Sequence, residues 1–390
     1  MNSMASWFLK EFENTGNYWE SFRGIFPVVE KYIYFNHAAI APLSVPVKDS
    51  MNACNERYCE EGIVCNLEYL DIAWDTRTMA ATLINCDPTE ITFVKNTTQG
   101  LHLAAHGIRW KPGDIVLIPE NEFPANVFPW LNLEEKGVET RFIPVSNGKY
   151  TATDISKLID KRTRAVSISA VSFIDGFKPD LVAIGQICRE HDLYFIVDAI
   201  QALGAMRLDV QEVGIDILAA DAHKWLLGPQ GTGFAYISKQ VLEYLVVENL
   251  GYKSMIDESD YLNYRIRLKP DASRFEEGTL NLTGIAGLHA SLEMLLSIGI
   301  SNIEKRILDL NRSLRDHLTK AGYRVLSPAA PDECSGIMSF KHPRISTEIV
   351  YRSLFEANIV CAIRGDAVRI SPHFYNDESD IRGFIKALPN

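Results

Sequence analysis

Lys224 lies in the setting with the clearest chemical meaning in this sequence. An apolar, strand-like run at residues 215–220 precedes it, and a glycine-rich turn at residues 228–233 follows it. A lysine that is desolvated where a strand ends, or placed beside other cations, loses proton affinity from its usual pKa of about 10.4 and becomes a nucleophile toward carbonyl groups. That is the chemistry of a Schiff base. Most lysines, however, are exposed at the surface. Other residues must therefore decide whether Lys224 is a Schiff-base lysine or an ordinary surface lysine in a loop.

An anion-binding site is predicted near the start of the chain's first long α/β stretch. A strand at residues 90–94 leads into a hydroxyl-rich turn at 95–100, and a helix is expected over 101–108. The free N–H groups and the dipole of a helix N-terminus attract anions. We interpret Thr97 and Thr98 as phosphate contacts, with simple N-capping as the alternative.

Asp198 ends the apolar run 193–197. A carboxylate in such a place is rarely buried without a cationic partner, and a protonated heteroaromatic nitrogen is one such partner. The alternative is that Asp198 caps the following turn.

The elements that must position these side chains alternate regularly between strand and helix. This order predicts an α/β fold with a largely parallel sheet covered by helices on both faces. Ligands of such sheets gather at the carboxyl ends of the strands. The expected strands are 114–119, 139–144, 165–171 and 193–198, and the expected helices between them are 126–136, 154–160 and 181–191. The residues just after predicted strands are Thr97, Glu122, Phe123, Ser172, Asp198, Gln201 and Lys224.

Three regions are expected along the chain. Residues 1–30 form an N-terminal helical segment that packs on the small domain, residues 31–283 form the large domain, and residues 284–390 form a smaller α+β domain. The irregular, tyrosine-rich residues 250–274 have no template, although they are expected to line the entrance to the site.

Composition excludes several classes of function. The net charge is −11 and no Lys/Arg cluster is present, which argues against nucleic-acid and membrane-surface partners. The N-terminus lacks an apolar segment of signal-peptide length, so a cytoplasmic protein is expected. The seven cysteines contain no CxxC pair, and His102 and His106 lack the glutamate of a HExxH motif, so no metal site is expected.

Several spaced motifs together resemble one known family, the aminotransferase class V group of pyridoxal 5'-phosphate (PLP) enzymes. That group includes cysteine desulfurases, selenocysteine lyases, kynureninases and isopenicillin N epimerases. The resemblance implies PLP as cofactor, a small-molecule amino-acid substrate, a homodimer, and PLP-dependent transferase fold type I. In that fold, helices sandwich a mostly parallel sheet of the seven-stranded type. The motifs are Asn36-His37-Ala38-Ala39, Thr97-Thr98-Gln99-Gly100, Glu122-Phe123-Pro124-Ala125-Asn126, Val197-Asp198-Ala199-Ile200-Gln201, His223-Lys224, Arg274-Phe275-Glu276-Glu277-Gly278-Thr279 and Arg369-Ile370-Ser371 with Tyr375-Asn376.

The resemblance implies a role for each residue around the cofactor ring. Lys224 would hold PLP covalently as an imine and later move protons at the substrate carbon. Asp198 would pair with the pyridine nitrogen and keep it protonated. Gln201 would hydrogen-bond the ring hydroxyl oxygen, and Phe123 would stack on the ring face.

The phosphate and the substrate are assigned in the same way. Thr98, His223 and the backbone near Thr97 would hold the phosphate, and Thr279 would add a contact from the neighbouring subunit. Arg369 would bind the substrate carboxylate as a bidentate pair.

The loop that begins at Asn36 and His37 continues in small residues, which let backbone approach a ligand. We expect both residues to contact substrate, with a plain connecting loop as the alternative.

The sequence departs from the desulfurase pattern. Many desulfurases have a histidine where Phe123 stands, and residues 364–369 contain no cysteine; Cys361 lies before them in an apolar strand. The reaction expected is therefore that of a carbon–sulfur lyase or an aminotransferase without the usual desulfurase cysteine.

Two alternatives remain open. One is an amino-acid epimerase or racemase of the isopenicillin N epimerase type. The other is a non-catalytic nucleotide- or PLP-binding protein, although residues 228–233 read GxxGxG rather than GxGxxG and lack the Gly-Lys-Ser/Thr of a P-loop.

Overall fold

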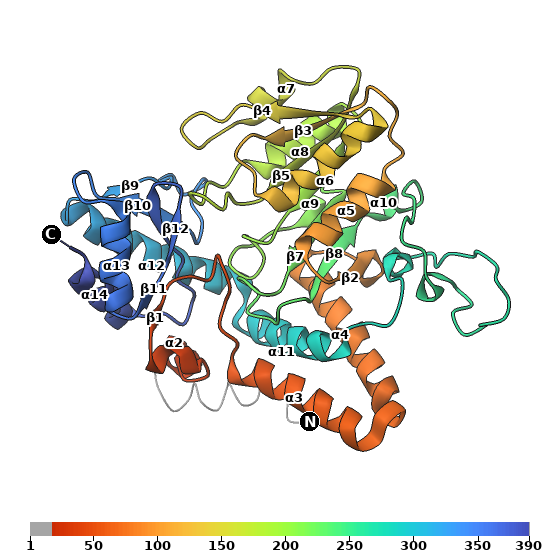
Figure 1. Ribbon diagram of the computed structural model, residues 1–390, viewed down its shortest axis with the longest axis horizontal. Coiled ribbons are helices and arrows are strands. Elements are labelled where there is room, and N and C mark those ends of the chain that lie inside the picture. Colours follow the sequence, from red (N-terminus) through yellow and green to blue (C-terminus); the bar gives the residue numbers. More distant parts are fainter. Residues whose placement is uncertain (1–17, 390) are drawn as a thin grey trace.

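A seven-stranded sheet runs through the centre of the computed structural model, which describes residues 18–389 (Figure 1). The sheet has the order β2-β8-β7-β6-β5-β3-β4. Its strands are β2 (Ile91–Val94), β3 (Ile115–Pro119), β4 (Glu139–Ile143), β5 (Thr163–Ser169), β6 (Tyr194–Asp198), β7 (Ile217–Asp221) and β8 (Gly233–Ile237).

Strand direction confirms the predicted α/β class. Strands β4, β3, β5, β6 and β7 pair in parallel, whereas β8 is antiparallel to both β7 and β2. Two reversals return β2 to the direction of β7, so the carboxyl ends of β2, β6 and β7 lie at one edge. The strands β3, β7 and β8 are buried along their whole length, as expected for a sheet covered on both faces.

Helices cover both faces because the strand side chains alternate between two cores. In β7, Leu218 and Ala220 belong to one core cluster, and Ile217 and Ala219 belong to the other. The first cluster includes residues of α4 (Asn66–Ile84), α8 (Leu181–Glu190) and α11 (Leu282–Ile298), and the second includes residues of α5 (Thr97–Gly107), α6 (Phe128–Leu131) and α10 (Lys239–Leu242).

The predicted continuous helix at residues 126–136 is wrong. The chain there forms a 3-10 turn (Pro124–Asn126), the four-residue α6 and a second 3-10 turn (Asn132–Lys136). Pro129 lacks the N–H that a continuing helix would need, so the helix cannot extend through it.

A second, four-stranded sheet has the order β12-β13-β10-β9 and its own apolar core. Its strands are β9 (Arg324–Val325), β10 (Met338–Lys341), β12 (Ala362–Arg364) and β13 (Ala367–Ile370). Around it lie α12 (Ile300–Lys320), α13 (Thr347–Glu356) and α14 (Glu378–Ala387), while β1 (Ile33–Tyr34) pairs in parallel with β11 (Ile359–Val360). The remaining helices are α2 (Tyr18–Arg23), α3 (Val45–Glu61), α7 (Ala152–Ser156) and α9 (Val210–Val213).

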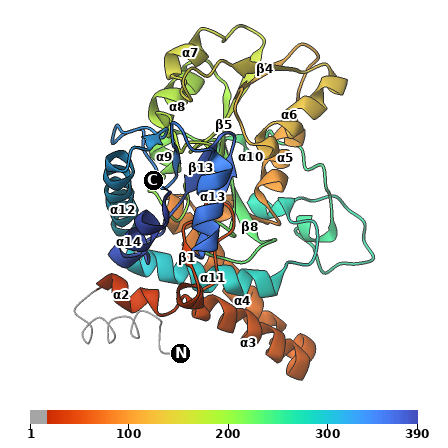
Figure 2. The ribbon, with the colours of Figure 1, turned by 60° about the vertical axis from the view of Figure 1, so that its left-hand side comes forward.

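The limits of the three predicted regions stay a prediction. Residues 1–17 of the expected N-terminal segment lie outside the described residues. In the part that follows, Phe22 and Phe26 contact Phe374, and Phe26 stacks on Tyr375 with ring centroids 4.0 Å apart. Helix α11 lies alongside α3 and α4 beneath the large sheet, as Figure 2 shows.

Among residues 18–389, no single helix is long and apolar enough to cross a membrane. Helices α11 and α12 reach that length and apolarity only as a pair, and the pair is bent by 79°.

Candidate active site

A cavity of about 350 Å³ lies at the carboxyl edge of the large sheet. Eight of the eleven residues predicted for the site line this cavity, although they come from five separate stretches of the chain. These eight are Thr97, Thr98, Phe123, Asp198, Gln201, His223, Lys224 and Arg369.

Lys224 is held by a rigid turn that follows β7. The N–H of Leu227 donates to the carbonyl of Lys224 (2.9 Å), and Leu227 has φ +56°, a left-handed conformation that residues other than glycine rarely adopt. Trp225 anchors the turn through two hydrogen bonds. Its indole N–H donates to Gln201 Oε1 (2.9 Å), and its carbonyl accepts from His373 Nε2 (3.0 Å). The lysine backbone is therefore fixed before any ligand binds.

The electrostatic setting of Lys224 favours a neutral amine. The residue is only 8% exposed, and the pKa of its amine is lowered to about 8, chiefly by burial; Asp198 opposes the change, and Arg369 and Arg364 add to it. Burial also raises the pKa of the Asp198 carboxyl to about 6, opposed by a hydrogen bond from the N–H of Ile200 (3.0 Å) and by Lys224. A buried carboxyl of this kind is suited to a cationic partner.

The N-terminus of α5 forms one wall of the cavity. Asn96 caps the helix by accepting from the N–H of Gln99 (2.9 Å), and within the described chain the N–H groups of Thr97 and Thr98 have no acceptor. The helix approaches β7 closely, since a Cβ on Gly100 would lie 2.5 Å from that of Ala219. These contacts set two free donors beside the lysine turn.

Thr97 and His223 both interact with Asp221, the last residue of β7. The Thr97 hydroxyl accepts from the N–H of Asp221 (3.0 Å), and His223 Nδ1 lies 3.0 Å from Asp221 Oδ2. Asp221 stands two residues before His223, where the family often has a phosphate-binding serine, and it lines the same cavity.

Arg369 on β13 brings an incompletely bonded guanidinium into the cavity. The residue is 1% exposed, and its Nη1 donates to the carbonyl of Phe173 (2.6 Å). Its Nε and Nη2 atoms are buried without a partner. Leaving donors of a buried guanidinium without acceptors costs free energy. A carboxylate ligand that accepts from Nε and Nη2 would remove this cost.

Phe123 forms the apolar wall opposite these groups. Its ring is 41% exposed and packs edge-on against Phe173, with centroids 5.1 Å apart. Lys224 Nζ lies 5.5 Å from the centroid of Phe123, which places the ring over the amine.

Three predicted residues lie outside the cavity lining. His37 is fully buried: its Nδ1 donates to the carbonyl of Ser371 (2.8 Å), and its Nε2 therefore accepts from the Tyr375 hydroxyl (2.7 Å). Direct substrate contact by His37 has no support in this geometry. Asn36 precedes it, and Ala38 to Ile40 line the cavity in their place. Thr279 lies at a different hollow and contacts the Tyr252 hydroxyl (3.3 Å).

Arg364, which was not predicted as a site residue, lines the cavity, whereas Glu122 lies outside its lining at a separate small hollow. Burial raises the pKa of the Glu122 carboxyl to about 7, and both its oxygens accept from Ser169 (2.5 Å each). Arg364 lines the cavity beside Arg369. The sequence feature that could have indicated Arg364 is its short separation from Arg369, with a Gly-Asp turn between them.

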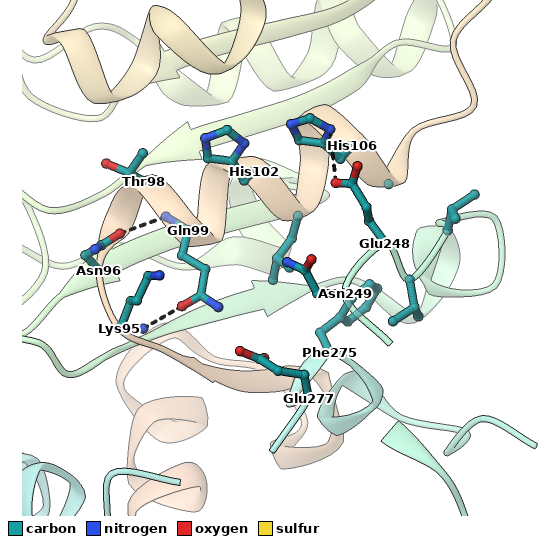
Figure 3. Close-up of a pocket in the computed structure, with 14 residues that line it drawn as sticks. Lys95, Asn96, Thr98, Gln99, His102, His106, Glu248, Asn249, Phe275 and Glu277 are labelled. Atoms are coloured by element: carbon teal, nitrogen blue, oxygen red, sulfur yellow. Dashed lines mark hydrogen bonds and ion pairs between the residues drawn. The ribbon is translucent and has the colours of Figure 1, made fainter. Parts of the chain in front are cut away.

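A larger hollow of about 510 Å³ lies on another side of α5, as Figure 3 shows. His102 and His106 stack there with ring centroids 5.0 Å apart, and His106 Nδ1 lies 3.0 Å from Glu248 Oε2. Among residues 18–389 no group of three His, Cys, Asp or Glu side chains is arranged to hold a metal ion. Although larger, this hollow lacks the buried lysine and guanidinium, so we place the chemistry in the smaller cavity.

The smaller cavity fits the chemical groups of PLP. Free N–H donors at a helix N-terminus suit a phosphate, a buried carboxyl suits a protonated pyridine nitrogen, and a desolvated amine suits an aldehyde. The residues are Thr97 and Thr98, Asp198 and Lys224, respectively.

Comparisons with known proteins agree with this fit. The family model for aminotransferase class V matches residues 33–384. A probable cysteine desulfurase of Methanothermobacter thermautotrophicus is 30% identical over 93% of this chain and 95% of its own length. An uncharacterized aminotransferase of Schizosaccharomyces pombe is 30% identical over 93% of each chain.

Solved structures share the fold. The apo cysteine desulfurase of Thermococcus onnurineus superposes with a TM-score of 0.85 at 25% identity, covering 94% of this chain and 96% of that one. The cystine C–S lyase C-DES, in complex with its product cysteine persulfide, superposes with a TM-score of 0.85 at 24% identity, covering 93% and 98%.

Proposed function

The chain belongs to the aminotransferase class V family of PLP-dependent enzymes, and from that premise we propose that it is a carbon–sulfur lyase acting on a small amino acid. The observation that carries the proposal is a cavity to which the described part of the chain contributes a buried lysine and an unsatisfied arginine but no thiol.

The substrate would be held by its α-carboxylate. Arg369 lines the cavity, and its Nε and Nη2 are two buried donors without a partner, a number that matches the two oxygens of a carboxylate. Phe123 and the backbone of residues 38–40 would cover the bound amino acid and exclude water.

PLP, when bound, supplies an electron-accepting ring that stabilises the electron pair left on the α-carbon after a bond there breaks. Asp198 would keep the ring nitrogen protonated, and Thr97, Thr98 and His223 would hold the phosphate. Gln201 already donates through Nε2 to the carbonyl of Ala38 (3.0 Å), so it would offer its second amide hydrogen to the ring hydroxyl oxygen.

Lys224 would move the protons of the elimination. The neutral amine removes the α-hydrogen as a proton, and the bond between the β-carbon and sulfur then breaks with its electron pair leaving on sulfur. The Lys224 ammonium returns the proton to that leaving group. Water converts the remaining unsaturated amino acid to a keto acid and ammonia.

The position of Cys361 argues against a persulfide on the protein. Its thiol is 5% exposed in the core of the smaller sheet, and burial raises its pKa to about 12. A thiol in that state is a poor nucleophile. Like the cystine C–S lyase C-DES, whose product is cysteine persulfide, this chain would release sulfur on a small molecule.

Transamination is the second candidate. Among residues 18–389, Lys224 is the single lysine that lines the cavity, and one amine is enough to move a proton between neighbouring carbons.

An amino-acid panel separates these reactions. Purified protein with PLP is incubated with cysteine, cystine, cysteine sulfinate, alanine and glutamate, and keto acid, sulfide, ammonia and racemisation are measured together. Sulfide or persulfide with equal amounts of keto acid and ammonia supports the lyase. Keto acid without ammonia supports the transaminase, and racemisation alone supports an epimerase.

Two variants control the panel. Lys224→Ala should abolish every product, whereas Lys136→Ala, which removes an exposed lysine, should leave all of them unchanged. Activity that survives Lys224→Ala would contradict the proposal.

We also propose a homodimer in which Thr279 reaches the partner's phosphate. The segment between α10 and α11 extends from the body in Figure 1, and its apolar side chains are exposed, with Tyr264 at 92% and Leu262 at 88%. A second copy would cover them. A monomer by light scattering, with Thr279→Ala leaving PLP affinity unchanged, would contradict this.

A further inference from the structure

We propose that His373 is a positioning residue for Lys224: from the segment that follows β13, its imidazole holds the turn that carries the lysine and keeps the amine fixed and out of water. His373 is fully buried and is not one of the described residues that line the cavity. The inference rests on the proposed role of Lys224 and goes beyond it, because it names the residue that holds this amine in place.

The carbonyls of the lysine turn, from His223 to Leu226, all accept hydrogen bonds. That of Lys224 accepts within the turn, from the N–H of Leu227 (2.9 Å). The other three accept from segments distant in sequence. Their donors are the N–H of Ala41 to His223 (2.7 Å), Nε2 of His373 to Trp225 (3.0 Å), and the hydroxyl of Ser291 to Leu226. Three separate segments therefore hold the turn, and the one after β13 does so through a side chain.

The partners of His373 determine which ring nitrogen carries the hydrogen. Nδ1 lies 2.9 Å from the N–H of Phe374, which can only donate, so Nδ1 accepts. Nε2 therefore carries the hydrogen and donates to the carbonyl of Trp225. Burial lowers the pKa of this imidazole to about 4. The ring is thus neutral, and its two hydrogen bonds persist, throughout the pH range in which Lys224 titrates.

The carbonyl of Trp225 depends on this one donor. The residue is fully buried, and among residues 18–389 no group other than His373 donates to its carbonyl. The space around the oxygen is small, since a Cβ on Gly204 would lie 2.2 Å from it. A buried carbonyl without a donor costs free energy unless water hydrates it. Water at this carbonyl would reach Lys224, the preceding residue, whose lowered pKa is due chiefly to burial.

The segment 369–373 joins two parts of the candidate site. It begins with Arg369, the proposed substrate ligand, and ends with His373, which holds the lysine turn. Between them, the carbonyl of Ser371 accepts from His37 Nδ1 (2.8 Å), which anchors the middle of the segment. One short segment therefore sets the distance between the amine and the substrate guanidinium.

Two amide variants separate the two hydrogen bonds of His373. In His373→Gln, the amide nitrogen can take the place of Nε2 and donate to Trp225. In His373→Asn, the shorter side chain can replace only Nδ1 and accept from Phe374. The rate of PLP linkage to each apo protein is measured by absorbance between about pH 6 and 10, and peptide mapping after borohydride reduction identifies Lys224. The variants leave unchanged the charged groups that act on this amine, which are Asp198, Asp221, Arg364 and Arg369.

Wild-type protein and His373→Gln should share one pH profile, which levels off near the lysine pKa of about 8. In His373→Asn the rate should level off roughly one pH unit higher and fall about tenfold at pH 7, because water that hydrates the Trp225 carbonyl also stabilises the ammonium. His317→Asn is the matched control. His317 is exposed and also donates to a carbonyl, that of Ser313 (2.8 Å), so its replacement should leave the profile unchanged.

The contrast between the two amides decides the proposal. A shifted profile in His373→Gln, or the same shift in both variants, would show that the imidazole only fills space and would overturn it. A His373→Asn protein with a lower Tm and the wild-type pH profile would overturn it as well, because the lost hydrogen bond would then affect stability alone.

The outcomes also separate this inference from the proposed function. PLP linkage needs no turnover, so the expected profiles without product from any amino acid would leave the role of His373 standing and refute the lyase. Wild-type protein that links no PLP at Lys224 would refute the proposed role of that lysine and this inference with it. Linkage at Lys224 with one profile in all proteins would refute only the role of His373.

Discussion

The pH dependence of Lys224 reactivity is the most direct consequence of the buried site. Its pKa of about 8 in place of 10.5 corresponds to roughly 3 kcal/mol of preference for the neutral amine, at 1.36 kcal/mol per pH unit. At pH 7 an amine of pKa 8 is about 9% neutral, and one of pKa 10.5 is about 0.03% neutral. The neutral fraction of Lys224 at pH 7 is therefore roughly 300-fold larger than that of an ordinary lysine, so Lys224 should react with an aldehyde well before the surface lysines do.

The direction of the effect is fixed by the sign of the pKa change. Because only the neutral amine attacks, the rate of PLP incorporation into the apo protein should rise about tenfold per pH unit below pH 8 and level off above it. Stopped-flow absorbance of the lysine-linked cofactor measures this rate, and peptide mapping after borohydride reduction identifies the lysine.

In Lys224→Arg, no PLP should be linked at position 224. PLP should then label only surface lysines, slowly and with a rate that still rises beyond pH 10. A wild-type rate that keeps rising through pH 9 and 10 would refute the claim that burial controls this amine.

Three further predictions concern substitutions. Arg369→Ala should raise KM for the amino-acid substrate about tenfold to a hundredfold while PLP affinity changes little; steady-state kinetics and cofactor titration compare the two, and equal effects would remove Arg369 from the substrate role. Cys361→Ala should leave product formation unchanged because the thiol is buried in a separate core; loss of sulfide release in a folded variant would contradict this. Gly336→Ala should lower the free energy of unfolding by about 1–3 kcal/mol, because a Cβ there would lie 2.4 Å from the Trp225 ring. Urea unfolding measures this loss, and Gly24→Ala, whose added Cβ would meet nothing within 4 Å, is the control. Equal stability of the two variants would contradict the prediction and show that Trp225 can move aside.

Local patterns determined the fold class and most of the candidate site. Apolar runs that end in Asp198 or lead to Lys224 are visible as strands, and parallel strands bring their ends to one edge. That rule alone predicts that residues far apart in sequence meet, and the structure gathers eight of them in one cavity. The helix predicted at residues 126–136 is wrong because Pro129 lacks the N–H that a continuous helix needs there.

The tertiary structure decided what long-range contacts control. His37 lies in a small-residue loop that reads as a ligand contact, yet packing against Ser371 and Tyr375 turns both ring nitrogens away from the cavity. Which groups remain unsatisfied also depends on neighbours distant in sequence, as Arg369 and Phe173 show.

By itself, the sequence determined the kind of chemistry: a lysine, an acid and an arginine of the right types in a recognisable order. Only the tertiary structure decided that Lys224 is desolvated and that Arg364 shares a face with Arg369. The burial of a side chain and the register of a strand both depend on contacts with segments distant in the sequence. No local run of residues is therefore enough to predict them.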